Sequence, residues 1–348
     1  MDDSKSVPLT YAASGVDIDA AAEAKKRIRR LARATFTAGV LNDIGSFGAL
    51  FRLDVSRYRE PLLVSSCDGV GTKLKLAFMT GIHNTVGFDL VSHCVSDIMV
   101  QGARPLFFLD YIACGKLEPG VVEQIVEGLS RGCSETGCAL VGGETAEMPD
   151  FYAEGEYDLA GFIVGVVDRD RVIDGSTIVP GDRLVGLASL GLHTNGYSLA
   201  RRIFFDRLKL SPEDRVSELG TTVCEALLAP HRSYWRLVEP LLDSGILKGL
   251  AHITGGGMTD NLPRILPHGT SADIRKGRWP VPPVFQFMLR AGSVPEAEMY
   301  RTFNMGIGMI LVVSERDLPV LEKHLLSLAE PVYEIGSIVH GNRTVCYT

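Results

Sequence analysis

The sequence of 348 residues lacks any apolar run of the about 20 residues that a membrane-spanning helix requires. It also lacks a positive excess, because its net charge is −7 and its pI is about 5.7. Proteins that bind nucleic acid generally present a basic surface, which this composition argues against. The first ten residues are polar and acidic, unlike a secretory signal. We therefore expect a cytoplasmic protein that binds neither membranes nor nucleic acid.

Paired cysteine motifs are missing as well. The seven cysteines are an odd number, and none of them forms a CxxC spacing. This pattern argues against zinc and against a disulfide framework, and it predicts that most of these thiols are small buried side chains. Hydrophobic residues make up 46% of the chain, which is enough for a core in each of two domains.

Strand-like and helix-like segments alternate along the chain, which predicts an α/β (α+β) fold. A turn-rich segment at 168–182 marks a boundary, so we assign residues 1–175 to a first domain and residues 176–348 to a second. In the first domain the patterns predict a helix capped by Asp17 or Asp19, a buried strand within 61–73, a helix at 86–101, a strand at 104–114, a helix ended by Gly137, and strands within 138–149 and 158–168. In the second they predict a strand at 183–189, a loop entering a helix at 191–208, a repeat of that design at 250–266, and a late strand at 306–314.

The stretch SSCDGVGTKLKL, residues 65–76, looks like a phosphate-binding loop but does not match the Walker pattern, because Thr72 separates Gly71 from Lys73. Gly69 and Gly71 would still allow backbone N–H groups to turn toward an anion, with Lys73 as a mobile positive charge. Asp68 would repel a bare phosphate, which suggests that Mg²⁺ lies between them. A plain glycine turn with a surface salt bridge is the alternative.

Further acids lie in apolar surroundings of the first domain. Asp97 lies within the predicted helix, Asp110 within a predicted strand, and Glu144 where a strand ends. Each could be a buried acid satisfied by backbone hydrogen bonds, but together with Asp68 they favour shared cations. His93 lies on one helix face between Asp89 and Asp97; we interpret it as a hydrogen-bonded packing residue, because acids suit Mg²⁺ better than imidazole does.

Two polar loops of the second domain precede predicted helices. Gly255, Gly256 and Gly257 would form an anion cradle for the substrate phosphate, or simply a tight turn. His193 and Asn195 could polarise a carbonyl or orient a substrate amide.

A set of longer stretches follows the order of a known family from about residue 11 to residue 313: SGVDID, IGSFGALF, DGVGTKLKLA, DIMVQGA, PLFFLDY, GCALVGGETAEMP, YDLAGF, HTNGYSL, HITGGGMTDNLPR, WPVPPVF and AEMYRTFNMGIGM. On these residues the chain resembles the aminoimidazole ribonucleotide synthetases, also called phosphoribosylformylglycinamidine cyclo-ligases. The resemblance implies ATP-dependent closure of formylglycinamidine ribonucleotide to aminoimidazole ribonucleotide in purine biosynthesis, with ADP and phosphate released. It also implies a homodimer whose first domains pair their sheets into a shared barrel, with ATP and Mg²⁺ in a cleft.

The resemblance carries over to individual residues. It implies nucleotide contacts for the DGVGTK motif, with Lys73 meeting phosphate oxygens, and metal contacts for acids of the same cleft. It places a loop that orients the substrate amidine in the second domain, and a basic residue linked to the nucleotide near the N-terminus. These positions are Asp68, Gly69, Gly71, Thr72 and Lys73 in the motif, Asp68, Asp97 and Glu144 for the metal, His193 and Asn195 in the loop, and Arg29. Ser96 departs from the family, which usually carries asparagine there.

Relatives of the same architecture are the alternatives. A selenophosphate synthetase would carry a reactive cysteine near the N-terminal glycine loop, and YAASGVDID has none. A hydrogenase-maturation enzyme would end in its reactive cysteine, whereas Cys346 is followed by two more residues. A thiamine-phosphate kinase is disfavoured by WPVPPVF and AEMYRTFN. A catalytically silent ATP-binding subunit is the alternative from another class, and the intact Asp68, Lys73 and Glu144 argue against it.

Overall fold

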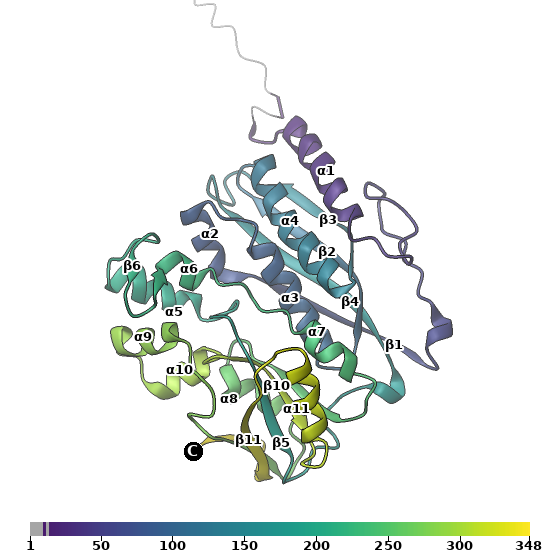
Figure 1. Ribbon diagram of the computed structural model, residues 1–348. Coiled ribbons are helices and arrows are strands. Elements are labelled where there is room, and N and C mark those ends of the chain that lie inside the picture. Colours follow the sequence, from purple (N-terminus) through teal and green to yellow (C-terminus); the bar gives the residue numbers. More distant parts are fainter. Residues whose placement is uncertain (1–9, 12–13) are drawn as a thin grey trace, which may run out of the picture.

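The computed structural model describes residues 10–11 and 14–348 and shows two mixed α/β domains, each built on its own sheet (Figure 1). The sequence predicts that the first ten residues are not a secretory signal, and most of these residues lie outside the described part of the chain. Within the described chain, no helix combines the length and apolar character that crossing a membrane requires. The predicted fold class is confirmed, and the two sheets fall on either side of the predicted boundary at residue 175.

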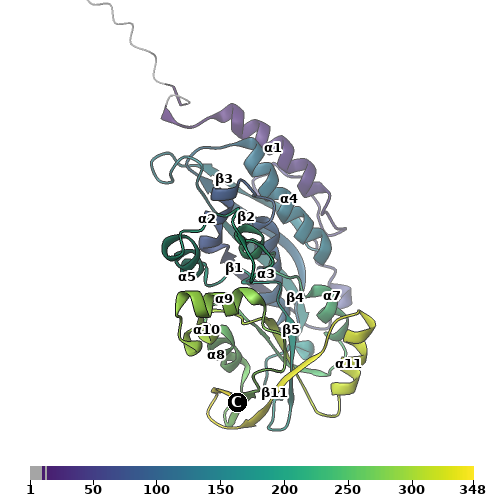
Figure 2. The same cartoon turned by 60° about the vertical axis from the view of Figure 1, so that its left-hand side comes forward.

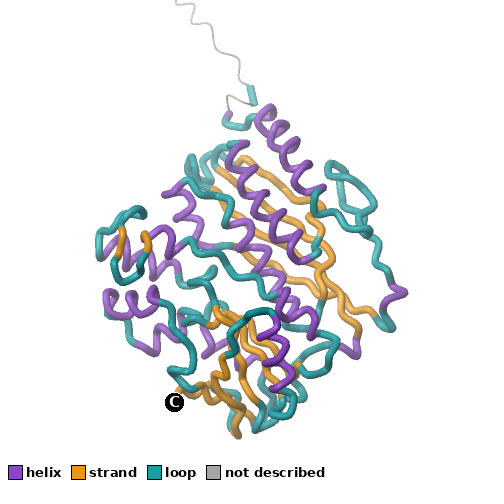
Figure 3. Tube along the Cα trace, in the orientation of Figure 1, coloured by secondary structure: helices purple, strands orange, loops and turns teal. Residues whose placement is uncertain are grey.

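The first domain is a four-stranded sheet with helices packed on one face (Figures 1 and 3). Its strand order is β1-β4-β2-β3, in which β2 and β3 are parallel and the other neighbours antiparallel. The elements are α1 (Ile18–Arg33), β1 (Pro61–Gly69), α2 (Leu74–Thr80), α3 (Val86–Met99), β2 (Arg104–Cys114), α4 (Pro119–Thr136), β3 (Ala139–Glu147) and β4 (Tyr157–Asp168). Helix α3 contacts β1, β2 and β4, while α1 and α4 reach β3.

Local signals explain where these helices begin and end. The carboxylate of Asp17 accepts the backbone N–H groups of Asp19 and Ala20 and so caps α1. Gly137 adopts the left-handed conformation and ends α4, as predicted. Every residue of α3 except Asp97 is buried, so this helix forms the centre of the domain. Asp97 is the one position where α3 meets open space.

The prediction of a buried strand within 61–73 is wrong. Strand β1 is an edge of the sheet, and none of its residues is fully buried. Its apolar composition misleads because only one face of this sheet is covered by helices. The opposite face carries Leu63 of β1, whose exposed fraction is 65%, and Phe162 of β4, at 43%.

The second domain has a six-stranded sheet, which lies below the first domain in Figure 2. Hydrophobic clusters cover both faces of this sheet. Along β10, Ile310 and Val312 join one cluster while Leu311 and Val313 join the other, as the alternation of a strand requires. The sheet order is β12-β9-β11-β5-β10-β8. Its strands are β5 (Arg183–Ala188), β8 (Leu247–His252), β9 (Thr270–Ile274), β10 (Ile307–Val313), β11 (Tyr333–His340) and β12 (Val345–Tyr347).

Short helices surround this sheet and meet the first domain. Helix α7 lies beside α3 and contacts it, which places the interface directly against the centre of the first domain (Figure 1). The helices are α5 (Tyr197–Arg201), α6 (Val223–Leu227), α7 (Trp235–Val238), α8 (Gly257–Asn261), α9 (Pro283–Gly292), α10 (Glu296–Thr302) and α11 (Leu318–Ser327), and a small hairpin pairs β6 (Arg215–Val216) with β7 (Thr221–Thr222). All seven cysteines are free and four of them are buried, in line with the sequence prediction.

Candidate active site at the domain interface

The end of β1 and the exposed turn of α3 bring two predicted acids together. Nε2 of His93 lies 2.8 Å from Oδ2 of Asp68 and 3.7 Å from Oδ2 of Asp97. The hydroxyl of Ser66 donates to Asp97 at 3.1 Å. Ligand atoms of Asp68, His93 and Asp97 all lie within 4.8 Å of one another. Since the side chains of Asp68 and Asp97 remain 43% and 26% exposed, a ligand can reach them from solvent.

Histidines keep both carboxylates ionised. Burial is the largest influence on the pKa of Asp68 and would raise it, but the hydrogen bond and charge of His93 and the backbone N–H of Gly69 together lower the pKa below its usual value. Burial would likewise raise the pKa of Asp97, and the hydrogen bonds from His252 and Ser66 together with the neighbouring histidines reverse that shift. Burial disfavours the charge of His93, but its bond to Asp68 and the charges of Asp68, Asp97 and Asp89 together raise its pKa. The group therefore presents two negative oxygen ligands at neutral pH.

Lys73 has a different position from the one predicted. Its ammonium group is fully buried, lies 2.6 Å from Oδ2 of Asp89, and donates to the carbonyl of Ala229 at 2.9 Å. Burial lowers the pKa of Lys73 and raises the pKa of Asp89, while their mutual attraction opposes both shifts. The expectation of a mobile cation in the glycine turn is wrong, because α3 supplies a carboxylate that holds this cation inside the interface. Thr72 of the same turn is exposed and contacts Ser198 at 3.2 Å.

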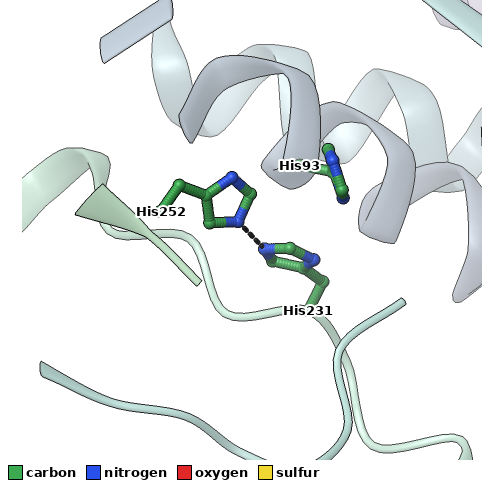
Figure 4. A group of neighbouring side chains, drawn as sticks. All are labelled: His93, His231 and His252. Carbon is green, nitrogen blue, oxygen red and sulfur yellow. Dashed lines mark hydrogen bonds between the residues drawn. The ribbon is translucent and has the colours of Figure 1, made fainter. Parts of the chain in front are cut away.

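The second domain contributes His231, His252 and Thr194 to the same interface, and Figure 4 shows the two histidines beside His93. Nδ1 of His252 lies 2.8 Å from Oδ1 of Asp97, and Nε2 of His252 lies 3.2 Å from Nε2 of His231. Oγ1 of Thr194 lies 2.8 Å from Nδ1 of His93 and 3.5 Å from Nδ1 of His231. A continuous hydrogen-bonded chain thus links Asp68 to Asp97 through both domains. Burial lowers the pKa values of His231 and His252, so both rings are neutral.

The predicted loop residues His193 and Asn195 lie beside this chain. The ring of His193 stacks on His231 with 4.1 Å between centroids, and its backbone adopts a left-handed φ of 61°. Its buried Nδ1 has no hydrogen-bond partner among the described residues. Desolvation lowers the pKa of His193 well below its usual value, so the ring is neutral. The structure therefore brings His193 to the interface behind His231 and fully out of solvent.

Asp110 and Glu144 lie on opposite faces of the first sheet. Asp68 pairs with Gly161, Gly161 with Asp110, and Asp110 with Gly143, so these four residues form one row across the sheet on the helix side. Glu144 follows Gly143 and therefore points to the other face, where it is exposed. The expected convergence of Glu144 with Asp68 and Asp97 does not occur in this chain. Burial raises the pKa of Asp110 to about 7, and the charge of Glu144 adds to that shift.

Two further predicted groups have local structural roles. Arg29 donates to the carbonyl of Ile44 at 2.9 Å, on a helix that contacts α4 and β3 at the far edge of the sheet from Asp68. Gly257 allows α8 to approach α10, because a Cβ there would lie 2.0 Å from the carbonyl oxygen of Tyr300. The structure does not bring Arg29 to the Asp68 group. Close packing is by itself a sufficient reason for Gly257, and Gly255 lies near the amide of Asn195.

Sequence reasoning missed His231 and His252. A signal was present, since His252 lies three residues before Gly255 of the glycine loop and His231 directly follows the run LLAP. Single histidines are weak signals, however, and only the folded chain shows that these two meet His93.

Comparison with known proteins places the chain in a family. Residues 48–167 match the model of the AIR synthase related protein N-terminal domain, and residues 179–347 match that of the C-terminal domain. A phosphoribosylformylglycinamidine cyclo-ligase of Syntrophotalea carbinolica is 54% identical over 95% of this chain and 94% of its own length. The cyclo-ligase of Brevibacillus brevis is 52% identical over 97% of both chains.

Solved structures share the fold at much lower identity. A thiamine-monophosphate kinase from Stenotrophomonas maltophilia superposes with a TM-score of 0.66 and 18% identity, covering 92% of this chain and 94% of the kinase. A hydrogenase maturation protein solved in complex with ATP gives a TM-score of 0.63 and 19% identity, covering 91% of this chain and 88% of its own. These likenesses show the architecture alone. Because both domain models match in order and the cyclo-ligases are more than half identical over nearly the whole chain, the chain belongs to the AIR synthase related family of phosphoribosylformylglycinamidine cyclo-ligases.

Proposed function

We propose that this protein uses ATP to close formylglycinamidine ribonucleotide into aminoimidazole ribonucleotide, releasing ADP and phosphate. One observation carries the proposal: identity of 54% to a cyclo-ligase extends over 95% of the chain and includes both domains. ATP use is supported by the fold, which a hydrogenase maturation protein in complex with ATP shares. In the cell this reaction belongs to purine biosynthesis, and we assign the protein to the cytoplasm.

The ring closure requires activation, because an amide oxygen is a poor leaving group. Transfer of the γ-phosphoryl group to the formamide oxygen gives an iminophosphate, whose carbon is attacked by the ring-forming nitrogen as phosphate leaves. The protein then contributes mainly alignment and charge neutralisation. We assign the orientation of the amidine to Asn195, which is half-buried beside Thr194. His193, neutral and enclosed, fixes the ring of His231 by stacking.

Asp68 and Asp97 fit Mg²⁺, since both are ionised, half-open carboxylates within 4.8 Å of each other and hard cations prefer oxygen ligands. Bound Mg²⁺ would neutralise charge on the triphosphate. The N–H group of Gly69 donates to Asp68 at 2.6 Å and orients that carboxylate. Gly71 holds the left-handed φ of 66° that such a turn needs, and its N–H group would face phosphate oxygens. Lys73 contributes through the buried pair with Asp89, which positions α3 under this turn.

A phosphate-release assay tests the proposal. In the presence of ATP and Mg²⁺, we expect the release of phosphate to depend on formylglycinamidine ribonucleotide. Aminoimidazole ribonucleotide should form in an amount equal to the phosphate released. Thiamine monophosphate serves as the control substrate, with formation of ADP as the readout, because kinases of that substrate share the fold and transfer the phosphoryl group without releasing phosphate. Substrate-independent release would show ATP hydrolysis without ring closure and contradict a cyclo-ligase. No release at all from folded protein would leave the silent ATP-binding subunit.

We also propose that the protein is a homodimer that pairs the open faces of two first-domain sheets. This face exposes Leu63 and Phe162, and β1 and β3 are edge strands with unpaired backbone groups. Cys67 lies opposite Phe162 on the same face. A partner sheet would cover the apolar side chains, and edge pairing would close a barrel.

Analytical ultracentrifugation tests the assembly. We expect a mass twice that of the chain, and Phe162→Glu should shift it to the monomer by placing a charge in the apolar contact. Phe151→Glu is the matched control, because Phe151 is also exposed but lies in the loop after β3. A monomeric wild-type protein, or a Phe162→Glu variant that stays dimeric, would refute this interface.

A further inference from the structure

The imidazoles of His93, His231 and His252 meet at the domain interface from three distant segments (Figure 4). His93 comes from α3, His252 ends β8, and His231 lies in the segment between α6 and α7. All three are buried, and one nitrogen of each lies within 4.8 Å of the others. Neither the proposed cyclisation nor the carboxylate pair uses His231.

The spacing of the two second-domain rings matches that of metal ligands. Nε2 of His231 lies 3.2 Å from Nε2 of His252. Two nitrogens bound to one tetrahedral Zn²⁺ at about 2.0–2.1 Å lie about 3.3 Å apart. One proton now joins the two nitrogens, and an ion that displaced it would require only small movements of the rings.

Outer hydrogen bonds already orient the rings as they do in metal sites. Asp97 accepts from Nδ1 of His252 at 2.8 Å, which leaves Nε2 of that ring for an ion, the carboxylate–histidine arrangement that strengthens metal ligands. Thr194 contacts Nδ1 of His231, so Nε2 of that ring becomes available to an ion once the proton that it shares with His252 is displaced. His93 would exchange one of its bonds, to Thr194 or to Asp68, for the ion.

From this geometry we propose that His93, His231 and His252 form a site for a divalent transition metal of the Zn²⁺ class. Imidazole nitrogen suits Zn²⁺, Co²⁺ and Ni²⁺, whereas Mg²⁺ prefers the neighbouring oxygens of Asp68 and Asp97. Because His93 belongs to the first domain and the other two to the second, the bound ion cross-links the domains. It stabilises the interface, and where His93 exchanges its bond to Asp68 for the ion, it withdraws His93 from that carboxylate.

Metal titration of the full chain tests the site without any use of activity. Protein stripped with a chelator is titrated with Zn²⁺ against a chromophoric competitor, and with Co²⁺ for its visible spectrum. We expect one ion per chain, a tetrahedral Co²⁺ spectrum and a Zn²⁺-dependent rise in the unfolding midpoint. His231→Gln and His252→Gln should each weaken binding by at least about 100-fold, beyond the effect of losing an outer partner.

Two controls separate this site from adventitious histidine binding. His340→Gln removes an exposed imidazole on β11, and His83→Gln removes a buried one bonded to Tyr157. Both should leave the affinity within twofold. Equal loss in either control, or full binding by His231→Gln, would overturn the proposal.

X-ray absorption on the wild-type protein covers the case in which a variant does not fold. Three nitrogen scatterers at about 2.0–2.1 Å from Zn²⁺ are expected. A shell of mainly oxygen, or no stoichiometric ion, would show that the three rings form a hydrogen-bonded core only. Neither result depends on the cyclo-ligase proposal, whose failure would appear in the phosphate-release assay.

Discussion

Two groups of charged residues lie within the same interface, and they differ in exposure to solvent and in how their charge is balanced. The pair of Lys73 and Asp89 has no exposed surface, and its charges cancel within the protein. The carboxylates of Asp68 and Asp97, about two turns of α3 away, are partly open to solvent, and within the described part of the chain their basic partners are histidines alone. The first pair therefore has a structural role, whereas the second retains negative charge that a cation from outside would neutralise.

This difference in exposure distinguishes two charged residues that lie close together in the sequence. Lys73 and Asp68 belong to one glycine-containing stretch, yet one side chain points into the interface and the other toward its opening. Substitutions should therefore have opposite signatures: loss of stability for the closed pair, and loss of turnover for the open one.

The largest effect is expected at the closed pair. Lys73→Met leaves Asp89 buried without its cation and should lower the free energy of unfolding by about 3–5 kcal/mol. Urea unfolding measures this change. Lys75→Met is the control, because Lys75 pairs with Glu156 at the surface and its loss should cost less than about 1 kcal/mol. Adding Asp89→Leu to Lys73→Met should restore much of the stability; no recovery would contradict the charge explanation.

The second largest effect is expected at a buried acid that has no cation beside it, where the free energy of unfolding should depend on pH. Among the described residues Asp110 forms no ion pair, and burial raises its pKa to about 7 from 3.8. Between these values the folded chain retains a proton that the unfolded chain has lost, so the free energy of unfolding falls as pH rises. The cost approaches about 4 kcal/mol above pH 7.

Asp110→Asn should remove this slope in buffer containing a chelator, while Asp158→Asn, an exposed position on β4, should keep it. Unfolding by urea at pH 5, 6, 7 and 8 measures both. A slope unchanged in Asp110→Asn would assign the titration to another group.

The open pair should respond in activity. Asp68→Asn preserves shape but removes a negative ligand, so turnover should fall at least 100-fold, about 2.7 kcal/mol in the activation free energy. Its free energy of unfolding should change by less than about 1 kcal/mol. Asp43→Asn serves as the control, because Asp43 pairs with Arg33 far from this group. Full activity in Asp68→Asn would refute the metal assignment and remove the contrast between the two pairs.

Sequence patterns predicted what is local. The alternation of strands and helices, the cap at Asp17 and the end of α4 at Gly137 follow from periodicity and from backbone preferences of single residues. The proximity of Asp68 and Asp97 was also within reach, because a strand end and a helix face of one domain meet early in the chain.

Other features depend on the direction of side chains in the assembled fold. Successive residues of a strand point to opposite faces, so Glu144 points to the face opposite Asp68 whereas its neighbour Gly143 does not. Only the register between β2 and β3 shows which of the two faces Glu144 occupies. The burial of Lys73 depends on Asp89 and on the second domain. His93 and His231 are 138 positions apart in the sequence, so no local pattern encodes their contact.

The thiol of Cys67 makes the open sheet face a natural reporter of assembly. It is exposed in the single chain and lies on the edge strand β1 opposite Phe162, within the surface that a second copy would cover. Cys346, near the C-terminus, is also exposed and belongs to the other domain. When the protein is diluted and the dimer separates, a bulky maleimide should alkylate Cys67 faster. The rate at Cys346 serves as the internal standard, so the ratio of the two rates reports dissociation of the dimer.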